Sequence, residues 1–568
     1  MRRVAGFFLL SLVLVACGDD DGSGPQEAAF TLDSIAPRSG TAGTEITVYG
    51  GGLAAEDSFL VFFDTLESPR VQRAGGQLYA LAPAGLEAGI TYDVRVERVG
   101  GGAETLAAAY TAVPPTVLRV NGASKTTGLV GMTILLEGAA FGDDMALAEG
   151  RVFFRGAGGS AIQATIANPA GDWADGFIVT AVPAGTADTS LIWVETATGA
   201  SDSVEFRLIT TGSFSPSVID WTLTTPLPQP LAGPGAAFVR VEAGAAPADY
   251  VFVLGGADTL GVATTTAVRA RVLETGALES WEAAGPPLPE ARAYHATAVA
   301  TPFTAPLDTL TAAVVYVLGG KDANGRTVSG VFAARVGLGG DISAWQPMTP
   351  LPQPLHSAGV AVFRGYVYLA GGADTLDAAV AGAYRARIGA DGALGAWEPI
   401  ASLPQPTAYA PLIGFGPYLY LVGGETGTSA PARSTLTTGE TASVRHARID
   451  LRTGNLDATG WMALPGAMAK ARSKHASVVG GGVLFTTSGV YSGNPGSSEN
   501  TYAPINADGT SGSWLGATGA ETIQAETGYA LYNQAAVYFV NSAGDGHVIV
   551  LGGANRATGR ASAAVVYY

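Results

Sequence analysis

The sequence predicts an all-β protein in which two sandwich domains precede a repeated array of four-stranded sheets. Short runs of β-branched residues are separated by Gly and Pro, without a sustained helical period. The 568 residues include 78 glycines, as a chain with many tight turns requires. From residue 215 onward, a glycine pair and a tryptophan recur at fixed spacing. A chain of this length, with 47% hydrophobic residues, can bury several cores, so we expect several domains.

The N-terminus has the pattern of an export signal. Arginines at positions 2 and 3 precede an apolar segment from 4 to 15. That segment is shorter than the about 20 residues that span a bilayer, and it fits a secretory signal. The junction LVAC at 14–17 resembles the lipobox of bacterial lipoproteins. The resemblance implies that residues 1–16 are a signal peptide and that Cys17 is lipidated and tethers the protein to a membrane. The alternative is an ordinary signal peptide with a chance cysteine.

The residues after Cys17 indicate in which membrane the protein is anchored. Gly18 stands where lipoproteins retained at the inner membrane carry Asp, so the resemblance implies the outer membrane. Residues 17–29, with the run DDDGSG, predict a flexible acidic linker. We therefore expect a lipid-anchored protein of the cell envelope, facing either the periplasm or the exterior.

Composition excludes several function classes. Cys17 is the one cysteine of the chain, so its lipidation leaves no thiol for a disulfide, a thiolate metal site or a cysteine nucleophile. The net charge of −17 deprives nucleic-acid binding of its main electrostatic contribution. We expect no nucleic-acid partner, no cofactor and no metal site.

Two similar segments follow the linker. The stretch IAPRSGTAGTEITVYGGGLA, at 35–54, resembles the opening of an IPT/TIG domain, which is an immunoglobulin-like β-sandwich. A second, similar stretch begins at Val117, although it lacks the early proline. The resemblance implies Ig-like domains at 30–113 and 114–210, each close to the roughly 100 residues of such a sandwich. Domains of this kind serve mostly as spacers or protein-contact surfaces.

The remainder of the chain is a repeat. Six apolar runs end at equivalent positions, five of them in Gly-Gly and the sixth in Ser-Gly: Gly255, Gly319, Gly371, Gly423, Ser488 and Gly552. Four of these positions are each followed by a tryptophan 26 residues later, at Trp281, Trp345, Trp397 and Trp514, whereas Gly423 precedes Trp461 by 38. The basic unit of 52 residues is close to the roughly 50 of a kelch repeat. The glycine pair and later tryptophan resemble kelch motifs, which implies a kelch-type β-propeller at 215–568.

The number of repeats predicts six blades of four strands. The sixth glycine pair lacks a later tryptophan, whereas Trp221 precedes the first pair. We therefore expect residues 217–222 to form the outer strand of the last blade, beside residues 563–568. This N-terminal outer strand would close the six-bladed β-propeller and leave no exposed sheet edge between its ends. We expect the tryptophans to pack between adjacent blades.

Candidate ligand-binding residues precede the inner strands, around the axis of the predicted propeller. Arginine, histidine and tyrosine at a channel mouth can hydrogen-bond to a sugar or peptide and stack on it. The candidates near the inner strands are Arg292, Tyr294, His295, His356, Tyr409, Arg472 and His475, and those on a long loop of the same face are Glu521, Glu526 and Tyr529. The alternative for each Arg and His is that it ties blades together through backbone carbonyls.

Three functions remain open. The first is a membrane-tethered binding or scaffold protein whose propeller contacts a glycan or a protein. The second is a sugar-modifying enzyme, because kelch propellers resemble sialic acid epimerases, which need only general acid–base groups. Copper-radical sugar oxidases have the same fold but need a cysteine that this mature chain lacks. The third is a purely structural envelope component. No catalytic residue is assigned.

Overall fold

The computed structural model is all-β, as the sequence predicts. It describes residues 30–53, 57–120, 125–128, 130–208, 217, 219–241, 248–301, 307, 311–427, 439–491, 499–506, 508–516, 522–541 and 545–568. The expectations for the signal peptide, Cys17 and the acidic linker concern residues outside these ranges. Within them, no helix is long and apolar enough to cross a membrane.

The first unit consists of two sheets that share one core. One sheet has the order β1 (Thr31–Ala36), β3 (Glu45–Gly51), β7 (Gln77–Leu81), β6 (Val71–Ala74), and the other β2 (Ser39–Gly40), β9 (Ala103–Ala112), β8 (Thr91–Arg98), β4 (Phe59–Phe63), β5 (Leu66–Glu67). Alternate residues of β3 and β4, such as Val48 and Val61, are fully buried in this core. The period of two is what places one face of each strand inside.

The second unit repeats this plan. Its sheets have the orders β10 (Thr116–Val120), β12 (Thr133–Ala139), β16 (Phe177–Ala181), β15 (Trp173–Ala174), and β11 (Lys125–Gly128), β19 (Val204–Leu208), β17 (Thr189–Thr196), β13 (Arg151–Arg155), β14 (Ala161–Gln163), with β18 (Gly199–Ala200) on β17. The short helix α1 (Pro169–Asp172) precedes β15. Trp173 is fully buried in the core, and its indole N–H donates to the carbonyl oxygen of Gly142 at 2.8 Å.

Six further four-stranded sheets follow within the described residues, and we number them in chain order. Each of the first five is formed by consecutive strands: β21 (Gly235–Val241), β22 (Ala248–Leu254), β23 (Ala267–Val272), β24 (Glu282–Ala283); β25 (Ala296–Ala300), β26 (Thr311–Leu318), β27 (Val331–Gly337), β28 (Gln346–Met348); β29 (Gly359–Phe363), β30 (Tyr366–Ala370), β31 (Ala383–Ile388), β32 (Leu394–Pro399); β33 (Leu412–Phe415), β34 (Tyr418–Val422), β35 (Val444–Ile449), β36 (Leu456–Ala463); and β37 (Ala476–Gly480), β38 (Val483–Thr487), β39 (Asn500–Pro504), β40 (Leu515–Gly516).

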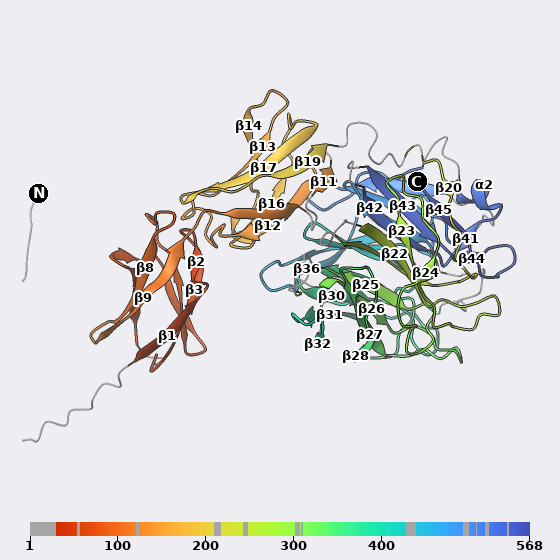
Figure 1. Ribbon diagram of the computed structural model, residues 1–568, viewed down its shortest axis with the longest axis horizontal. Helices are drawn as coiled ribbons and strands as arrows, with labels where there is room; N and C mark the ends of the chain where they lie inside the picture. The colour runs from red at the N-terminus through yellow and green to blue at the C-terminus, as the bar shows by residue number, and fades with distance from the viewer. Residues whose placement is uncertain are drawn as a thin grey trace, which may run out of the picture.

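The sixth sheet joins both ends of this region. Its order is β42 (Ala535–Val540), β43 (Gly546–Leu551), β45 (Val565–Tyr567), β20 (Thr222–Leu223). The predicted pairing of the 217–222 segment with the last residues is thus present, although the observed strand is shorter and begins at Thr222. The helix α2 (Ile523–Thr527) and the small strands β41 (Leu531–Tyr532) and β44 (Ala554–Asn555) lie at the same end of the molecule (Figure 1).

The first strands of the six sheets form a closed cycle. Each of them contacts the first strand of the next sheet, and β42 of the sixth sheet contacts β21 of the first. The first strands therefore surround a common axis, and we call the six sheets together the ring.

The recurrent glycines have a steric reason. Gly255 has a φ of 55°, and a Cβ added there would lie 2.3 Å from the carbonyl oxygen of Arg292. In the fifth sheet Ser488 occupies the equivalent position and has nearly the same conformation, with a φ of 59°. The turn is therefore retained where the glycine is lost, at the cost of a strained non-glycine residue.

The recurrent tryptophans link neighbouring sheets. In four of them the indole N–H donates to a backbone carbonyl oxygen just past the outer strand of the preceding sheet: Trp281 to Thr225 at 3.0 Å, Trp345 to Pro286 at 3.1 Å, Trp397 to Thr349 at 3.2 Å and Trp461 to Ala401 at 2.8 Å. The buried indole nitrogens of Trp221 and Trp514 have no such bond to any described residue. The fixed spacing reflects this repeated contact.

The second unit packs directly on the ring. The Arg364 guanidinium lies 4.5 Å from the centre of the Phe177 ring, and Arg448 forms an ion pair with Asp172. Leu135 and Phe177 share a core cluster with residues of the third and fourth sheets. Arg364 lies in the turn between β29 and β30, and Phe415 is the last residue of β33, so the second unit packs at the ends of these first strands (Figure 1).

Candidate functional site

Six equivalent residues surround the axis of the ring. Each lies shortly before the first strand of its sheet and has a left-handed backbone conformation, with φ between 51° and 58°: Gly233, Tyr294, Ser357, Tyr409, Lys474 and Asn533. Five of them carry side chains, although such a φ is uncommon for residues other than glycine. A conformation repeated in every sheet indicates a feature of the fold, and we call these residues the axial ring.

Backbone hydrogen bonds connect the members of the axial ring. Tyr294 N–H donates to the carbonyl oxygen of Gly233 at 2.8 Å, and Ser357 N–H donates to that of Tyr294 at 2.8 Å. In the same way Tyr409 N–H donates to the carbonyl oxygen of Ser357, Gly233 N–H to that of Asn533, and Asn533 N–H to that of Lys474, at 2.8 to 3.0 Å. Because their backbone groups are engaged in this way, the side chains are held at fixed positions around the axis.

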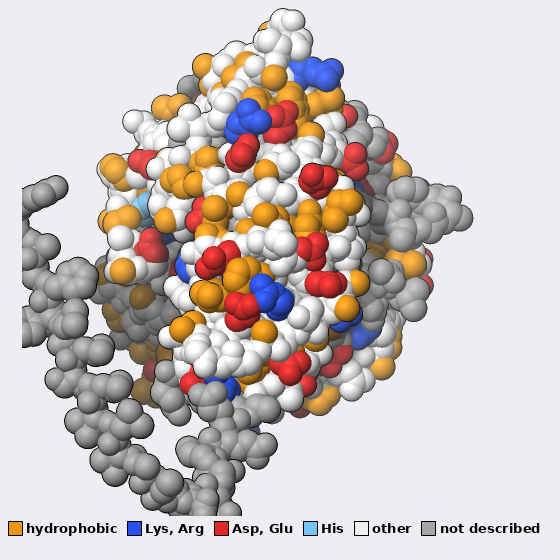
Figure 2. Space-filling model, turned by 90° about the vertical axis from the view of Figure 1, so that its left-hand side faces the viewer, with side chains coloured by type: hydrophobic (Ala, Val, Ile, Leu, Met, Phe, Trp, Pro, Cys, Tyr) orange, Lys and Arg blue, Asp and Glu red, His pale blue; other side chains and the backbone are white. Residues whose placement is uncertain are grey.

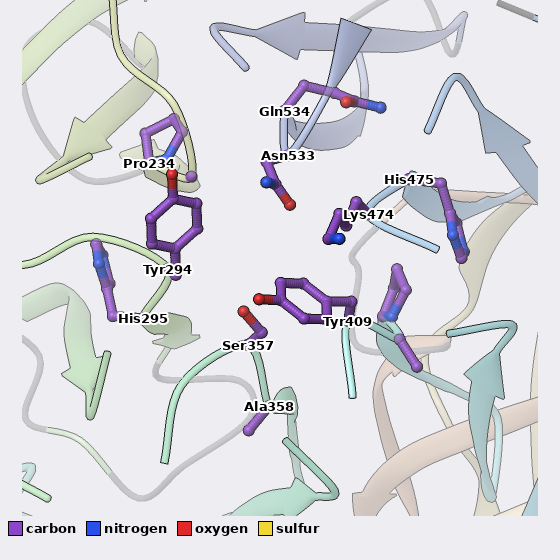
Figure 3. Close-up of a pocket in the computed structure, with 13 residues that line it drawn as sticks. Pro234, Tyr294, His295, Ser357, Ala358, Tyr409, Lys474, His475, Asn533 and Gln534 are labelled. Atoms are coloured by element: carbon purple, nitrogen blue, oxygen red, sulfur yellow. The ribbon is translucent and has the colours of Figure 1, made fainter. Parts of the chain in front are cut away.

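The axial ring lines a cavity of about 170 Å³ (Figure 3). The residues that follow it complete the wall: Pro234, His295, Ala358, Ala410, Pro411, His475 and Gln534. The lining combines two phenol rings with hydroxyl, amide and ammonium groups. Such a mixture of an aromatic surface and a few polar groups is typical of a small-ligand site. We call this cavity the axial pocket.

A hydrogen-bonded chain runs from the pocket into the third sheet. The Ser357 hydroxyl lies 3.1 Å from Nδ1 of His356, and Nε2 of His356 lies 2.8 Å from Oδ1 of Asp377. Lys321 Nζ is 2.7 Å from the same carboxylate oxygen. The hydrogen bond from His356 is the main reason why the pKa of Asp377 lies below its usual value, so the carboxylate is ionised and only accepts. Nε2 therefore carries the proton, and Nδ1 accepts from Ser357.

A buried ion pair lies on the opposite side of Tyr409. Lys474 Nζ is 2.9 Å from Glu425 Oε1, and their side chains are 0% and 2% exposed. The Ser473 hydroxyl donates to the same oxygen at 2.8 Å. The Lys474 ammonium also lies 4.8 Å from the centre of the Tyr409 ring. Burial, followed by the nearby Glu425, raises the pKa of the Tyr409 hydroxyl well above its ordinary value. Tyr409 therefore stays protonated and uncharged.

Two histidines form part of the wall as neutral groups. Burial, with a smaller effect of the Arg292 charge, lowers the pKa of His295 to about 3. Burial and Arg472 lower that of His475 to about 3 as well. Neither imidazole carries charge near neutral pH.

Several of the predicted site residues meet in the axial pocket, and others do not. Tyr294, His295, Tyr409 and His475 line it, while His356 lies behind Ser357. Arg292 and Arg472 are buried away from it, at 1% and 0% exposure.

Each of these arginines has a partner elsewhere. Arg292 donates to the backbone oxygen of Ala291 at 2.9 Å, and its guanidinium lies 5.3 Å from the centre of the Phe332 ring. Arg472 donates to the backbone oxygen of Glu499 at 3.0 Å. Both arginines thus bind backbone carbonyls, but those of the adjacent Ala291 and of Glu499 in the same sheet as Arg472, so these bonds do not tie two sheets together.

The predicted residues of the long loop are also absent from the lining. Glu526 lies in α2, and the Tyr529 hydroxyl is 2.8 Å from that of Ser562. Glu521 lies outside the described residues. No group of three or more His, Cys, Asp or Glu side chains in the described ranges is placed to hold a metal ion.

The sequence-based candidates omit Ser357, Lys474, Asn533, Gln534 and Glu425. The sequence contains a positional signal for Ser357, Lys474 and Asn533. It is visible when the repeats are aligned, because Tyr294 and Lys474 occupy the same place in the segments ARAYHA and ARSKHA. Selection by residue type favoured the arginines, whereas alignment of these segments identifies the position that faces the axis.

Comparisons with known proteins give little beyond the fold. No protein-family model matches the chain, and no curated protein matches it. A solved structure entitled "Structure of YjhT" is similar at 15% sequence identity, with a TM-score of 0.40. The similarity covers 61% of this chain and 96% of that one.

Proposed function

We propose that this chain is a lipid-anchored protein of the cell envelope that binds a glycan or protein partner in the axial pocket of a six-bladed, kelch-type β-propeller. In this proposal the two-sheet units are Ig-like domains of the IPT/TIG type, and Cys17 carries the lipid. The six sheets with their cyclic contacts and the pairing of β20 with β45 support the propeller assignment.

The observation that carries the binding function is the axial ring. Each of the six sheets contributes one residue in a left-handed conformation to a single cavity, and five of these residues carry a side chain. Because this conformation recurs in every sheet it belongs to the fold, and the binding function is inferred from the polar and aromatic side chains that it directs to one cavity. A purely structural channel does not need tyrosine, serine, lysine and asparagine at this place.

The position of the pocket suits a presented binding site. The axial ring stands before the first strands, whereas the second unit packs on turns at the opposite ends of these strands. The pocket therefore lies on the face of the ring that is opposite the contacts with the second unit. If Cys17 anchors the chain, this face points away from the membrane.

Two exposed leucines on the same face help to distinguish a protein partner from a glycan. Leu260 and Leu376 lie in identical ADTL segments between the second and third strands of two sheets, and are 77% and 79% exposed. A protein partner that covers the rim of the pocket would bury them, whereas a sugar in the pocket would not reach them.

Binding to a glycan array and to solubilised envelope fractions tests the proposal. We expect Ser357→Ala and Asn533→Ala to weaken binding about tenfold by removing polar contacts. For a glycan ligand, Leu260→Ser and Leu376→Ser are the matched controls and leave binding unchanged. Loss of binding in the leucine variants as well as in the pocket variants identifies a protein partner, and loss in the leucine variants alone contradicts binding in the pocket. No binding by the wild-type chain supports a purely structural role.

The tether is tested separately. Cys17→Ser releases the protein from the membrane fraction if Cys17 is lipidated, and retention of the variant contradicts the anchor.

The chain of contacts through His356 favours a sugar-modifying enzyme as a second candidate. Ser357, His356 and Asp377 form a path for a proton between the pocket and a carboxylate. Sugar anomer exchange followed by NMR tests this activity, and a rate equal to the uncatalysed one excludes it.

A further inference from the structure

The charges around the axial pocket are balanced in pairs. Lys474 is the lining residue that carries a full charge among the described residues of the wall, and Glu425 neutralises it at 2.9 Å. The next ion pair, between Lys321 and Asp377, is likewise neutral as a whole. The two wall histidines are uncharged. The pocket is therefore polar but has no net charge.

Glu425 is held rigidly beside Lys474. Its backbone N–H donates to the carbonyl oxygen of Ala408 at 2.8 Å, and its own carbonyl oxygen accepts from Ala408 at 2.9 Å. The hydrogen bond from Ser473 orients its carboxylate. With both side chains almost fully buried, Glu425 cannot swing into solvent without breaking these contacts.

These contacts determine which ligands the pocket accepts. An anionic ligand group that approached Lys474 would compete with Glu425 for the ammonium and lie close to a buried carboxylate of the same charge. Like charges at such a distance in a buried site oppose each other strongly. Uncharged hydroxyl groups can instead bond to Ser357 and Asn533, which line the same cavity.

We infer that the axial pocket selects an uncharged, hydroxyl-rich group such as a neutral sugar residue, and that the Glu425–Lys474 pair excludes ligands carrying a carboxylate, sulfate or phosphate. This inference rests on the proposed binding function and adds the ligand class. It also separates the pocket from sites for acidic sugars, since sialic acid carries a carboxylate.

A specificity switch tests the inference. The probes are pairs of glycans that differ only in an acidic group, such as a glucoside and the corresponding glucuronide, measured with the full chain. We expect the wild-type chain to bind the neutral member about tenfold or more tightly than the acidic one, because a buried charge without a free partner is unfavourable. Glu425→Gln leaves the ammonium uncompensated, and we expect this variant to gain binding of the acidic member.

The double variant Glu425→Gln/Lys474→Met is the matched control. It restores a pocket without net charge, so it does not gain acidic ligands. If Glu425→Gln does not fold, as judged by its circular dichroism, the wild-type comparison and the double variant still decide the question.

The outcomes separate this inference from the proposed function. Equal or tighter binding of acidic glycans by the wild-type chain overturns the inference and leaves glycan binding intact. Unchanged acidic binding in a folded Glu425→Gln variant overturns it as well. A wild-type chain that binds neither member of any pair overturns the inference together with the glycan-binding form of the proposed function.

Discussion

Thr222 pairs with Tyr567 in the two outer strands of the sixth sheet, although the two residues stand at opposite ends of the ring's sequence. The neighbouring pair joins Leu223 to Val566. This sheet is therefore completed by residues that the chain provides before the first sheet begins, and the stability of the ring depends on both of its ends.

Val566 tests this closure. Its side chain is 1% exposed and shares a cluster with Trp221 and Ile219. We expect Val566→Asp to lower the free energy of unfolding by about 3 kcal/mol or more, because it buries an unpaired carboxylate. Leu223→Asp, at a position 49% exposed, is the control and should change it by less than about 1 kcal/mol. Urea unfolding of Val566→Asp at the same midpoint as the wild-type chain would mean that this closure does not stabilise the ring.

Trp461 tests the contact between neighbouring sheets. It is 7% exposed, and its indole N–H donates to Ala401 of the preceding connection. We expect Trp461→Ala to cost about 3–5 kcal/mol, since it leaves a cavity between two sheets. Trp461→Phe keeps most of the aromatic side-chain volume, so it should lower the free energy of unfolding by less.

The same substitution at the more exposed Trp345 is the control for Trp461. If Trp345→Ala destabilises the protein as much as Trp461→Ala in thermal unfolding, the tryptophans do not act through burial between sheets.

The two wall histidines predict a loss of stability in acid. Their pKa values in the folded protein, about 3, lie below the value of 6.5 expected for an exposed histidine. Below about pH 6.5 the unfolded chain binds protons that the folded chain does not, so the free energy of unfolding falls by about 1.4 kcal/mol per pH unit for each histidine. This decline ends near pH 3, where the folded form also becomes protonated.

Replacement of the histidines checks this reasoning. Urea unfolding at about pH 7 and about pH 5 should show a weaker pH dependence for His295→Gln and His475→Gln, and the weakest for the double variant. An unchanged pH dependence in the double variant would show that the two imidazoles titrate normally in the folded state.

The ion pair between Arg448 and Asp172 predicts coupling between the second unit and the ring. Asp172 is largely buried, and burial raises its pKa while Arg448 opposes that rise. Arg448→Met removes this opposition, so we expect the pKa of Asp172 to rise further. A double-mutant cycle with Asp172→Asn should give a coupling energy of about 1–3 kcal/mol.

The pair Arg385–Glu398 is the reference for this cycle. It lies within one sheet, and Glu398 is 59% exposed, so its coupling should be below about 1 kcal/mol. Equal coupling for the two pairs would indicate that the contact between the second unit and the ring does not contribute to stability.

The sequence predicts the sheets of the ring better than the contacts between the ring and the second unit. The interval from the glycine pair to the tryptophan is visible because the same turn and the same inter-sheet bond recur in successive copies, as with Gly371 and Trp397. The prediction that the segment containing Trp221 completes the last sheet follows from comparing the positions of the glycine pairs and the tryptophans. The packing of Asp172 on Arg448 leaves no such signal, because it occurs once and joins residues 276 positions apart.

The candidate site is predicted only in part for a related reason. Tyr294 and Tyr409 were found because aromatic residues before the inner strands are easily seen. The direction of each side chain depends on the left-handed backbone of the axial ring, which turns Lys474 toward the axis and leaves Arg472 buried against the backbone of Glu499 in its own sheet. Residue type alone does not carry that information.

Charged side chains of both signs share the face of the molecule shown in Figure 2. The net charge is −17, and on the face shown in Figure 2 the described acidic, basic and apolar side chains are interspersed. A basic surface of the kind that follows a phosphate backbone is not visible on that face.

Protection of a single thiol in the axial pocket tests the central claim most directly. Because Cys17 is the one natural cysteine, Ser357→Cys in a Cys17→Ser background provides one reactive group at the pocket wall. Ser343→Cys, on the exposed outer side of the second sheet, provides the control. We expect neutral oligosaccharides to slow maleimide labelling at position 357 several-fold, to leave position 343 unaffected, and to act more strongly than their acidic counterparts. Labelling at position 357 that neutral oligosaccharides do not slow, or that acidic ones slow equally, would contradict the account.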